Sequence, residues 1–257
     1  MRILFFGNNR LGYQVLEWLR TNHENIVGVV LHPQNRAKYH KEFVTLAENS
    51  HWERFDGSML NQPEVLERIR MLAPELGISV LFGYILKRPL LDLLANRCIN
   101  LHPSYLPFNR GAFPNVWSIV DDTPAGATLH YIDEGIDTGA IVAQVRVPVE
   151  PIDTGASLYT KLEEAALELF KKSWTKICDS NVEPQIQDLN AGTRHSIADV
   201  KRIDEIDMDC TYTAKELINI LRARTFPPHD GAYFWSGGRK IFMRLELYEA
   251  QEQDLSR

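Results

Sequence analysis

The chain has 257 residues, 44% of them hydrophobic, which is enough for a sizeable core in one large domain or a domain with a small appendage. Its formal net charge of −6 disfavours a broad basic face for long nucleic acid, but allows a local cationic pocket. The sequence contains no apolar run of membrane-span length, and Met1–Gly7 is too quickly polar for a signal peptide. Its three widely spaced cysteines fit no zinc-binding spacing and suit a reducing compartment. We therefore expect a cytoplasmic protein that binds no metal and, given its short apolar runs, has no membrane partner.

Apolar runs and helical periodicity alternate over the first hundred residues. Short runs rich in β-branched residues predict strands, and apolar residues spaced three or four apart predict helices. The stretch 32–58 is polar and weakly patterned. Because alternating strands and helices are typical of βαβ units, we expect a Rossmann-like α/β domain with a mostly parallel, twisted sheet. The expected strands are 2–6, 26–31, 78–82 and 98–101, with helices around Leu11–Leu19, after Pro63 and at 89–94.

The pattern changes after Pro124, where a Gly- and Asp-rich loop joins two predicted strands. A long helix, a shorter helix and a β-hairpin follow. We place a domain boundary near residue 185, between a catalytic domain at 1–185 and a C-terminal helix and β-hairpin region at 186–257. In chain order, these later elements are strands 127–131 and 140–147, helices 155–177 and 214–224, and a hairpin around Ser236–Gly238.

The loop Gly7–Gly12 follows the first strand and opens the first helix. Such a loop can receive an anion at the helix N-terminus, and Asn9 is our candidate there for substrate binding. The loop lacks the GxGxxG spacing of dinucleotide sites, and the chain lacks a P-loop Gly-Lys-Ser/Thr. The simpler interpretation is that the two glycines serve turn geometry and close packing of the helix on the sheet.

Asn100 and His102 stand at the end of the strand predicted at 98–101, just before Pro103. Residues i and i+2 of a strand point to the same side, and open α/β sheets bind ligands beyond the carboxyl ends of their strands. A polar pair is costly to bury unless it is used or paired. The pair therefore predicts either a functional site or an Asn–His pair that satisfies its own backbone.

Asp137 lies in the loop Asp133–Gly139, between two predicted strands. Because Asp and Gly are common in turns, this loop by itself predicts only a hairpin turn. Its place in a longer series of motifs is more informative. From Asn100 to Gly139 the order is Asn-x-His-Pro-Ser, Leu-Pro, Arg-Gly, Gly-x-Thr-Leu-His and Asp-x-Gly-Ile-Asp-Thr-Gly.

This series resembles the catalytic core of the tetrahydrofolate-dependent formyltransferases. That family includes glycinamide ribonucleotide, methionyl-tRNA and nucleotide-sugar N-formyltransferases. The resemblance covers residues 1–180 in the order of elements and residues 100–139 motif by motif. It implies N10-formyltetrahydrofolate as the formyl donor, and it assigns catalysis to Asn100, His102 and Asp137.

The chemistry of formyl transfer suits these three residue types. Attack of an amine on the formyl carbon gives a tetrahedral, oxyanionic intermediate, to which the Asn100 amide can donate. His102 titrates near neutral pH and can accept the proton of the amine. Asp137 can orient His102 or hold a water that relays the proton, and either His102 or Asp137 can be the first proton acceptor.

The resemblance also assigns the folate site. The segment Leu81–Leu86 presents backbone groups and apolar side chains to the pterin, and the loop Tyr131–Asp137 closes over it. Gly83 lets a flat ring approach the backbone, between apolar walls, whereas Leu81 is expected in the core. The donor-binding residues are expected at Phe82, Gly83, Tyr84, Ile85, Leu86, Tyr131, Ile132 and Asp133.

Segments 109–111, 114–117 and Leu221–Phe234 resemble the nucleotide-sugar N-formyltransferases, whose acceptor is an amino-dideoxy sugar on a nucleoside diphosphate such as dTDP or GDP. An arginine there can pair with a phosphate, and an aromatic ring can stack on a base. The same rings can instead pack the hairpin onto the helix or onto a second subunit. The acceptor-binding residues are expected at Asn9, Ser104, Tyr105, Arg110, Gly111, Phe226 and Tyr233.

We therefore expect an enzyme that formylates a nucleotide-linked amino sugar, dTDP-linked in the first place, for O-antigen (lipopolysaccharide) or related glycan synthesis. A short apolar hairpin needs a partner surface, which favours a homodimer. A tRNA acceptor fits the acidic chain and its short C-terminal region poorly. The alternatives are another small amine such as a ribonucleotide, a formyltetrahydrofolate hydrolase, and a folate-binding sensor.

Overall fold

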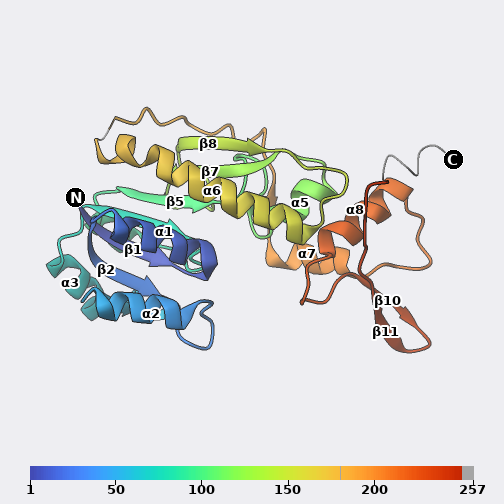
Figure 1. The fold of residues 1–257 in the computed structure, drawn as a ribbon, viewed down its shortest axis with the longest axis horizontal. Helices are drawn as coiled ribbons and strands as arrows, with labels where there is room; N and C mark the ends of the chain where they lie inside the picture. The colour runs from blue at the N-terminus through green and yellow to red at the C-terminus, as the bar shows by residue number, and fades with distance from the viewer. Residues whose placement is uncertain (180, 251–257) are drawn as a thin grey trace.

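A seven-stranded mixed sheet forms the centre of the protein in a computed structural model that describes residues 1–179 and 181–250 (Figure 1). The strand order is β3-β2-β1-β4-β5-β7-β8. Strands β1 to β5 run parallel, and β7 and β8 are antiparallel at one edge, so the expected fold class is confirmed. The strands are β1 (Arg2–Gly7), β2 (Asn25–Leu31), β3 (Glu53–Asp56), β4 (Leu76–Val80), β5 (Cys98–His102), β7 (Ala125–Tyr131) and β8 (Ile141–Val147).

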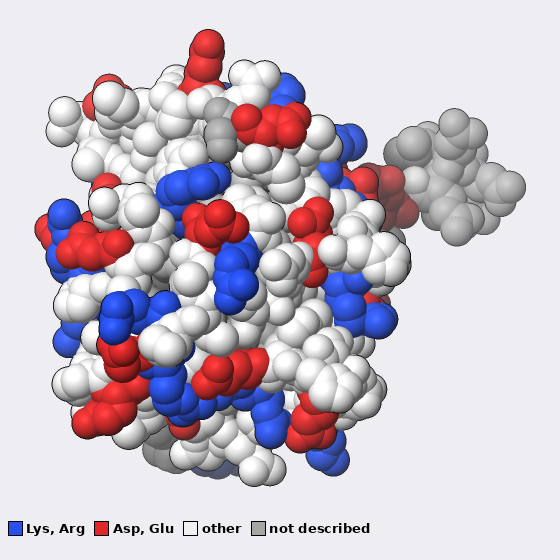
Figure 2. All heavy atoms as spheres, turned by 90° about the vertical axis from the view of Figure 1, so that its left-hand side faces the viewer, with Lys and Arg blue, Asp and Glu red and all other residues white. Residues whose placement is uncertain are grey.

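The side of the molecule at the left of Figure 1 carries charges of both signs. Lysines and arginines are interspersed there with aspartates and glutamates, and no basic stripe crosses that face (Figure 2). Ion pairs near this side neutralise individual charges, as between Arg68 and Glu53 at 2.7 Å. This face therefore offers no extended track for a polyanion.

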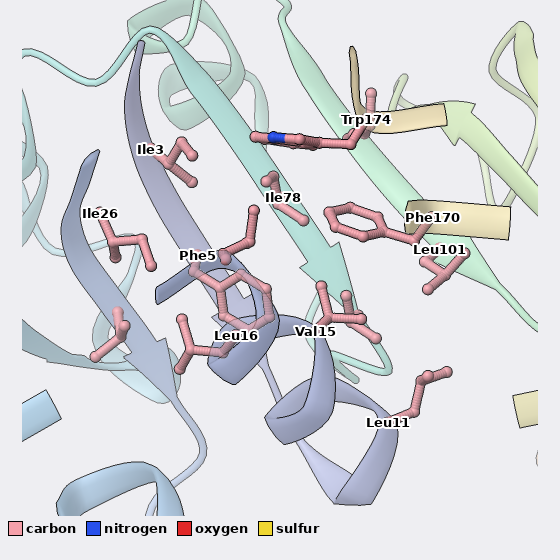
Figure 3. Packing of buried hydrophobic residues seen from close by; sticks show 14 of the residues in the cluster. Ile3, Phe5, Leu11, Val15, Leu16, Ile26, Ile78, Leu101, Phe170 and Trp174 are labelled. Atoms are coloured by element: carbon pink, nitrogen blue, oxygen red, sulfur yellow. The ribbon is translucent and has the colours of Figure 1, made fainter. Parts of the chain in front are cut away.

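Helices cover both faces of the sheet, because alternate residues of its strands point to opposite sides. Ile3 and Phe5 face one core, and Leu4 and Phe6 face the other. In the first core, Phe5 of β1 lies among side chains of the strands and of two covering helices (Figure 3). That face carries α1 (Asn9–Thr21), α2 (His40–Asn49) and α6 (Gly155–Cys178), and the other carries α3 (Pro63–Met71) and α4 (Arg88–Leu93).

The long helix α6 begins at a capping box. The Thr154 hydroxyl accepts from the Ser157 N–H at 3.3 Å, and the Ser157 hydroxyl accepts from the Thr154 N–H at 3.0 Å. This exchange satisfies backbone donors that the first helical turn leaves free. The cap fixes where α6 starts, and the helix then crosses the sheet from the C-terminal region to β7 and β8.

Several short elements have no clear sequence signal. In the polar stretch 32–58 lie α2, which buries only Phe43, Leu46 and Ala47, and β3, which buries only Phe55. The predicted strand 78–82 is wrong at its end, because β4 stops at Val80 and the next residue turns into the left-handed region. The other unpredicted elements are the 3₁₀ turn Gly57–Met59, β6 (Arg110–Gly111), α5 (Pro114–Val120), β9 (Arg194–His195) and α7 (Ile197–Asp204).

The C-terminal region forms α8 (Ala214–Arg224) and the hairpin of β10 (Tyr233–Ser236) and β11 (Arg239–Phe242), as the sequence predicts. Gly237 and Gly238 both have positive φ, at 55° and 75°, which a two-residue hairpin turn requires. A third core joins this region to the sheet domain through Trp117, Leu162 and Ala223, among others. Within the described residues, no helix is long and apolar enough to cross a membrane.

Candidate active site

Four polar side chains converge where β5 and β7 meet the loop after β7. The Asn100 Nδ2 atom lies 3.1 Å from His130 Nε2 and 3.5 Å from Asp137 Oδ1. The second Asp137 oxygen, Oδ2, lies 3.6 Å from His102 Nε2. The structure thus brings together the three residues predicted as catalytic, and it adds a second histidine.

The register of two antiparallel strands explains this convergence. Asn100 pairs with His130 and His102 pairs with Thr128, so side chains of β5 and β7 alternate on the same face. The strand β5 ends at His102, and Asp137 reaches back from the following loop. The predicted alignment of Asn100 and His102 is therefore present, at the carboxyl end of a parallel strand.

His130 was not predicted as a site residue, although it closes the Gly-x-Thr-Leu-His motif. Its Nδ1–H donates to the Tyr131 carbonyl at 2.8 Å, which leaves Nε2 as the acceptor for the Asn100 amide. It is only 2% exposed. The motif could have indicated it. His130 lies two residues after Thr128 and so shares its face of the strand, and the pairing of β7 with β5 makes this the face of Asn100.

The His102 ring is held by one nitrogen and free at the other. It donates to the backbone carbonyl of Asn109, while Nε2 is buried without a hydrogen-bond donor or acceptor among the described residues. Burial lowers the pKa of His102, and this effect outweighs the attraction of the Asp137 carboxylate. At neutral pH the imidazole is therefore uncharged, with a lone pair on Nε2.

Asp137 is an ionised carboxylate. Burial by itself would raise the pKa of this carboxyl, but its attraction to His102 and His130 and a hydrogen bond from Gly111 hold the pKa well below its ordinary value. The Gly111 N–H donates to Oδ2 at 2.9 Å. Gly111, predicted to bind the acceptor, is thus placed beside the catalytic candidates.

The segment predicted to bind the pterin has both inward and outward side chains. Phe82 and Tyr84 pack with His32, with ring centroids 5.2 Å and 4.8 Å from the His32 ring, and Leu86 enters the second core. The Gly83 N–H donates to His32 Nε2 at 3.2 Å. The outward part consists of the Gly83 backbone and of Ile85, which is 71% exposed.

The loop on the other side of the site is braced from within. Asp133 accepts from the Thr138 hydroxyl at 2.6 Å and from the Gly135 N–H at 3.0 Å. The Ile132 N–H donates to the Cys98 carbonyl at 2.8 Å, and the Tyr131 N–H donates to Ala140. The predicted donor-binding residues Tyr131, Ile132 and Asp133 therefore shape a fixed loop that ends at Asp137.

The predicted acceptor-binding residues occupy different parts of the molecule. Ser104 is buried and its hydroxyl donates to the Phe108 carbonyl at 2.5 Å, and the Tyr105 ring lies under the Arg146 guanidinium. The Arg110 guanidinium faces the carbonyls of Leu189 and Thr193, at 3.3 Å and 3.4 Å. Outside this area, Asn9 begins α1, Phe226 packs on Tyr159, and Tyr233 lies in the hairpin on Phe242.

Two family models match the chain. One, described as formyl transferase, covers residues 1–173, and the other, described as the N-formyltransferase dimerization C-terminal domain, covers residues 199–249. A methionyl-tRNA formyltransferase of Synechococcus sp. (strain JA-3-3Ab) is 32% identical over 234 residues, which cover 87% of this chain and 71% of that protein. A dTDP-4-amino-4,6-dideoxyglucose formyltransferase of Mycobacterium tuberculosis (strain ATCC 25618 / H37Rv) is 30% identical over 185 residues, or 72% and 79%.

Solved structures agree with these matches. A 4-N formyltransferase from Francisella tularensis has a TM-score of 0.83 and 29% identity, over 97% of this chain and 98% of that one. The formyltransferase PseJ from Anoxybacillus kamchatkensis, solved with UDP-4,6-dideoxy-4-formamido-L-AltNAc and tetrahydrofolate, has a TM-score of 0.60 and 26% identity, over 79% and 89%. With a family model matched over more than half of its length and with these likenesses, the chain belongs to the formyl transferase family.

Proposed function

We propose that this enzyme transfers a formyl group from N10-formyltetrahydrofolate to the amine of a nucleotide-linked amino-dideoxy sugar, with a dTDP-sugar as the first candidate. The observation that carries the proposal is the convergence of Asn100 and His102 on the Asp137 carboxylate, at 3.5 Å and 3.6 Å. The likenesses to a dTDP-4-amino-4,6-dideoxyglucose formyltransferase and to PseJ, which was solved with a UDP-linked formamido sugar, support the sugar acceptor.

His102 is the proposed proton acceptor. The amine nitrogen forms a bond to the formyl carbon, the bond from that carbon to N10 of the folate breaks, and one proton must leave the amine. The uncharged His102 imidazole, with its free lone pair on Nε2, can take that proton at neutral pH. The Asp137 carboxylate, 3.6 Å away, stabilises the imidazolium that results, and the proton can pass on to N10 as tetrahydrofolate leaves.

Asn100 is the proposed donor to the formyl oxygen. Its two amide hydrogens face His130 Nε2 at 3.1 Å and Asp137 Oδ1 at 3.5 Å. The second contact is at the long end of the hydrogen-bond range, so it is the weaker one. The formyl oxygen can accept from that hydrogen in place of Asp137 Oδ1 as negative charge develops on it, while the contact with His130 keeps the amide in place.

The pterin fits between the two loops on chemical grounds. Gly83 and the exposed Ile85 give a flat ring an apolar surface and a close approach to backbone groups. Across the site, the Arg88 guanidinium reaches Glu134 at 3.6 Å, which links the start of α4 to the Tyr131–Asp137 loop. PseJ, a protein of related sequence and fold, was solved with tetrahydrofolate, which supports a folate donor here.

Two further features belong to this proposal. The match to a dimerization domain over residues 199–249 supports a homodimer built from the C-terminal region. A formylated nucleotide sugar is a building block for cell-surface glycans, so we place the enzyme in O-antigen or lipopolysaccharide synthesis. Size-exclusion chromatography with light scattering tests for the homodimer. Loss of the formylated sugar from the glycan of a strain that lacks the gene tests the role in glycan synthesis.

A methionyl-tRNA acceptor is the second candidate, because a methionyl-tRNA formyltransferase is 32% identical over 87% of the chain. One experiment distinguishes the two functions. The enzyme is incubated with N10-formyltetrahydrofolate and, in parallel, with dTDP-, GDP- and UDP-linked amino sugars and with methionyl-tRNA. We expect a formyl group on a sugar nucleotide, and transfer to the tRNA alone would overturn the sugar proposal.

A further inference from the structure

The chain after α6 returns to the catalytic cluster along residues 185–195, here called the return segment. At its start, Gln185 and Ile141 exchange two backbone hydrogen bonds, of 2.7 Å and 2.9 Å, beside the sheet edge. At its end, β9 pairs with β6, which contains Gly111. The return segment lies outside the matched range 1–173 of the formyl transferase model, yet it contacts residues within that range.

Gln187 is the buried side chain of the return segment that faces the catalytic loop. It is 7% exposed, and its Nε2 donates to the backbone carbonyls of Asp137 at 3.0 Å and of Gly139 at 2.6 Å. The Gln187 amide thus holds the backbone of both Asp137 and Gly139. These two hydrogen bonds hold the backbone of the loop, and the Asp137 carboxylate contacts His102.

The backbone of Asp137 needs such a tie. Its φ of 54° lies in the left-handed region, which a non-glycine residue adopts only when its surroundings impose it. The carboxylate reaches His102, His130 and the Gly111 N–H from this conformation. If the loop relaxed to an ordinary backbone conformation, the carboxylate would be aimed elsewhere.

The Gln187 amide lowers the stability of the fold through its unpaired oxygen. Its Oε1 is buried and has no hydrogen-bond partner among the described residues. A side chain that served only to fill this space would be apolar, because an unpaired buried acceptor destabilises the fold. The two N–H donors, and not the packing, therefore account for a glutamine at this position.

The same segment also supports His102. The Thr193 hydroxyl donates to Asn109 Oδ1 at 2.9 Å and accepts from the Asn109 N–H at 2.8 Å. Asn109 is fully buried, with a φ of 54°, and its backbone carbonyl accepts from the His102 ring. The return segment therefore braces both reacting side chains, one through Gln187 and one through Thr193.

We propose that Gln187 is a positioning residue for formyl transfer, which holds the Asp137 carboxylate on His102, so that Gln187 and Thr193 of the return segment complete the active site. The proposal rests on the proposed function, because it assigns Gln187 a role in that reaction. It does not make Gln187 a catalytic residue, since its amide contacts only backbone carbonyls.

The test compares Gln187→Met with Gln185→Met. Methionine has the length and flexibility of glutamine but lacks both donors, and Gln185 is exposed and acts through its backbone, so its variant is a matched control. We expect kcat to fall roughly tenfold or more in Gln187→Met, with a smaller change in the KM of each substrate, and no change in Gln185→Met. An unchanged kcat in Gln187→Met would overturn the proposal.

A second readout needs no acceptor and separates the failure of this proposal from the failure of the proposed function. The charged and titratable groups that face His102 are Asp137 and His130, and Asp137 raises its pKa. If the carboxylate moves away, the pKa of His102 falls, and NMR of the histidine ring follows this titration directly. An unchanged titration in Gln187→Met refutes the positioning role, even if wild-type enzyme formylates no sugar.

A third variant covers the case in which Gln187→Met does not fold. Gln187→Asn keeps the amide but withdraws it by one methylene, so the donors cannot reach both carbonyls. We expect it to fold and to show the same lower pKa of His102 and lower kcat. Wild-type kcat and titration in Gln187→Asn would contradict the proposal.

Discussion

Asn100 on β5 and His130 on β7 are directly opposite one another in the antiparallel register, and the Asn100 amide donates to His130 Nε2 at 3.1 Å. Because His130 Nδ1–H is engaged by the Tyr131 carbonyl, the ring presents only an acceptor to Asn100. This contact fixes which end of the amide carries the donors. The orientation of the proposed oxyanion donor is therefore set by the neighbouring strand.

Replacing His130 should weaken catalysis without a change of substrate affinity. In His130→Leu the Asn100 amide loses the acceptor that orients it, so we expect kcat to fall about tenfold to a hundredfold, short of the loss of an oxyanion donor itself. Steady-state kinetics with both substrates measures this, with exposed His23→Ala as the control. A change confined to KM would show that His130 acts in binding.

The pH dependence of kcat/KM should have an acid limb set by His102. Because burial lowers the pKa of this imidazole below its ordinary value of 6.5, the limb should lie below pH 6.5, with a plateau above it. The Asp137 carboxylate raises the pKa of His102, so Asp137→Asn should move the limb to still lower pH while reducing the plateau. A limb above pH 6.5, or a shift to higher pH in Asp137→Asn, would contradict this assignment.

Arg110 offers a test of the acceptor side. Its guanidinium faces the Leu189 and Thr193 carbonyls of the return segment, close to Gly111 and so to Asp137. If it pairs with a phosphate of the nucleotide, Arg110→Ala should raise the KM for the sugar nucleotide about tenfold, and that for the folate less. Exposed Arg20→Ala is the control, and equal effects on both KM values would argue against a phosphate contact.

The sequence predicted the elements with strong periodicity and missed those without it. The helix α8 is found at the predicted residues, because it carries a regular apolar spacing. The helix α5 was not predicted, and its buried face is explained by contacts with α6, α8 and β7. Periodicity reports one segment at a time, and short elements depend on partners far along the chain.

The residues of the candidate site were likewise only partly predictable from the sequence. Asn100 and His102 could be aligned from strand geometry alone, and Asp137 could be added only from the order of the motifs. Gln187 could not be predicted, because nothing in a polar, irregular stretch indicates that its amide returns to the loop of Asp137. Contacts of this kind depend on the path of the chain after α6, which the local sequence does not determine.

The core that carries the site should depend strongly on α6. Phe170 is fully buried between β-strand side chains and Trp18, and it lies among the labelled core residues of Figure 3. Phe170→Ala removes a large side chain from a packed core, so we expect the free energy of unfolding to fall by about 3–5 kcal/mol. Urea denaturation measures the loss, and the exposed Met71→Ala should lie within about 0.5 kcal/mol of wild type.

His102 and Asp137 are proposed to carry formyl transfer to a nucleotide-linked amino sugar. Mass spectrometry of a dTDP-amino sugar, incubated with N10-formyltetrahydrofolate and enzyme, is the decisive measurement. We expect the wild-type enzyme to add one formyl group, and His102→Ala and Asp137→Ala to do so at least about a hundredfold more slowly while staying folded by circular dichroism. Wild-type rates in either variant, or no formylation of any dTDP-, GDP- or UDP-linked amino sugar, would contradict this proposal.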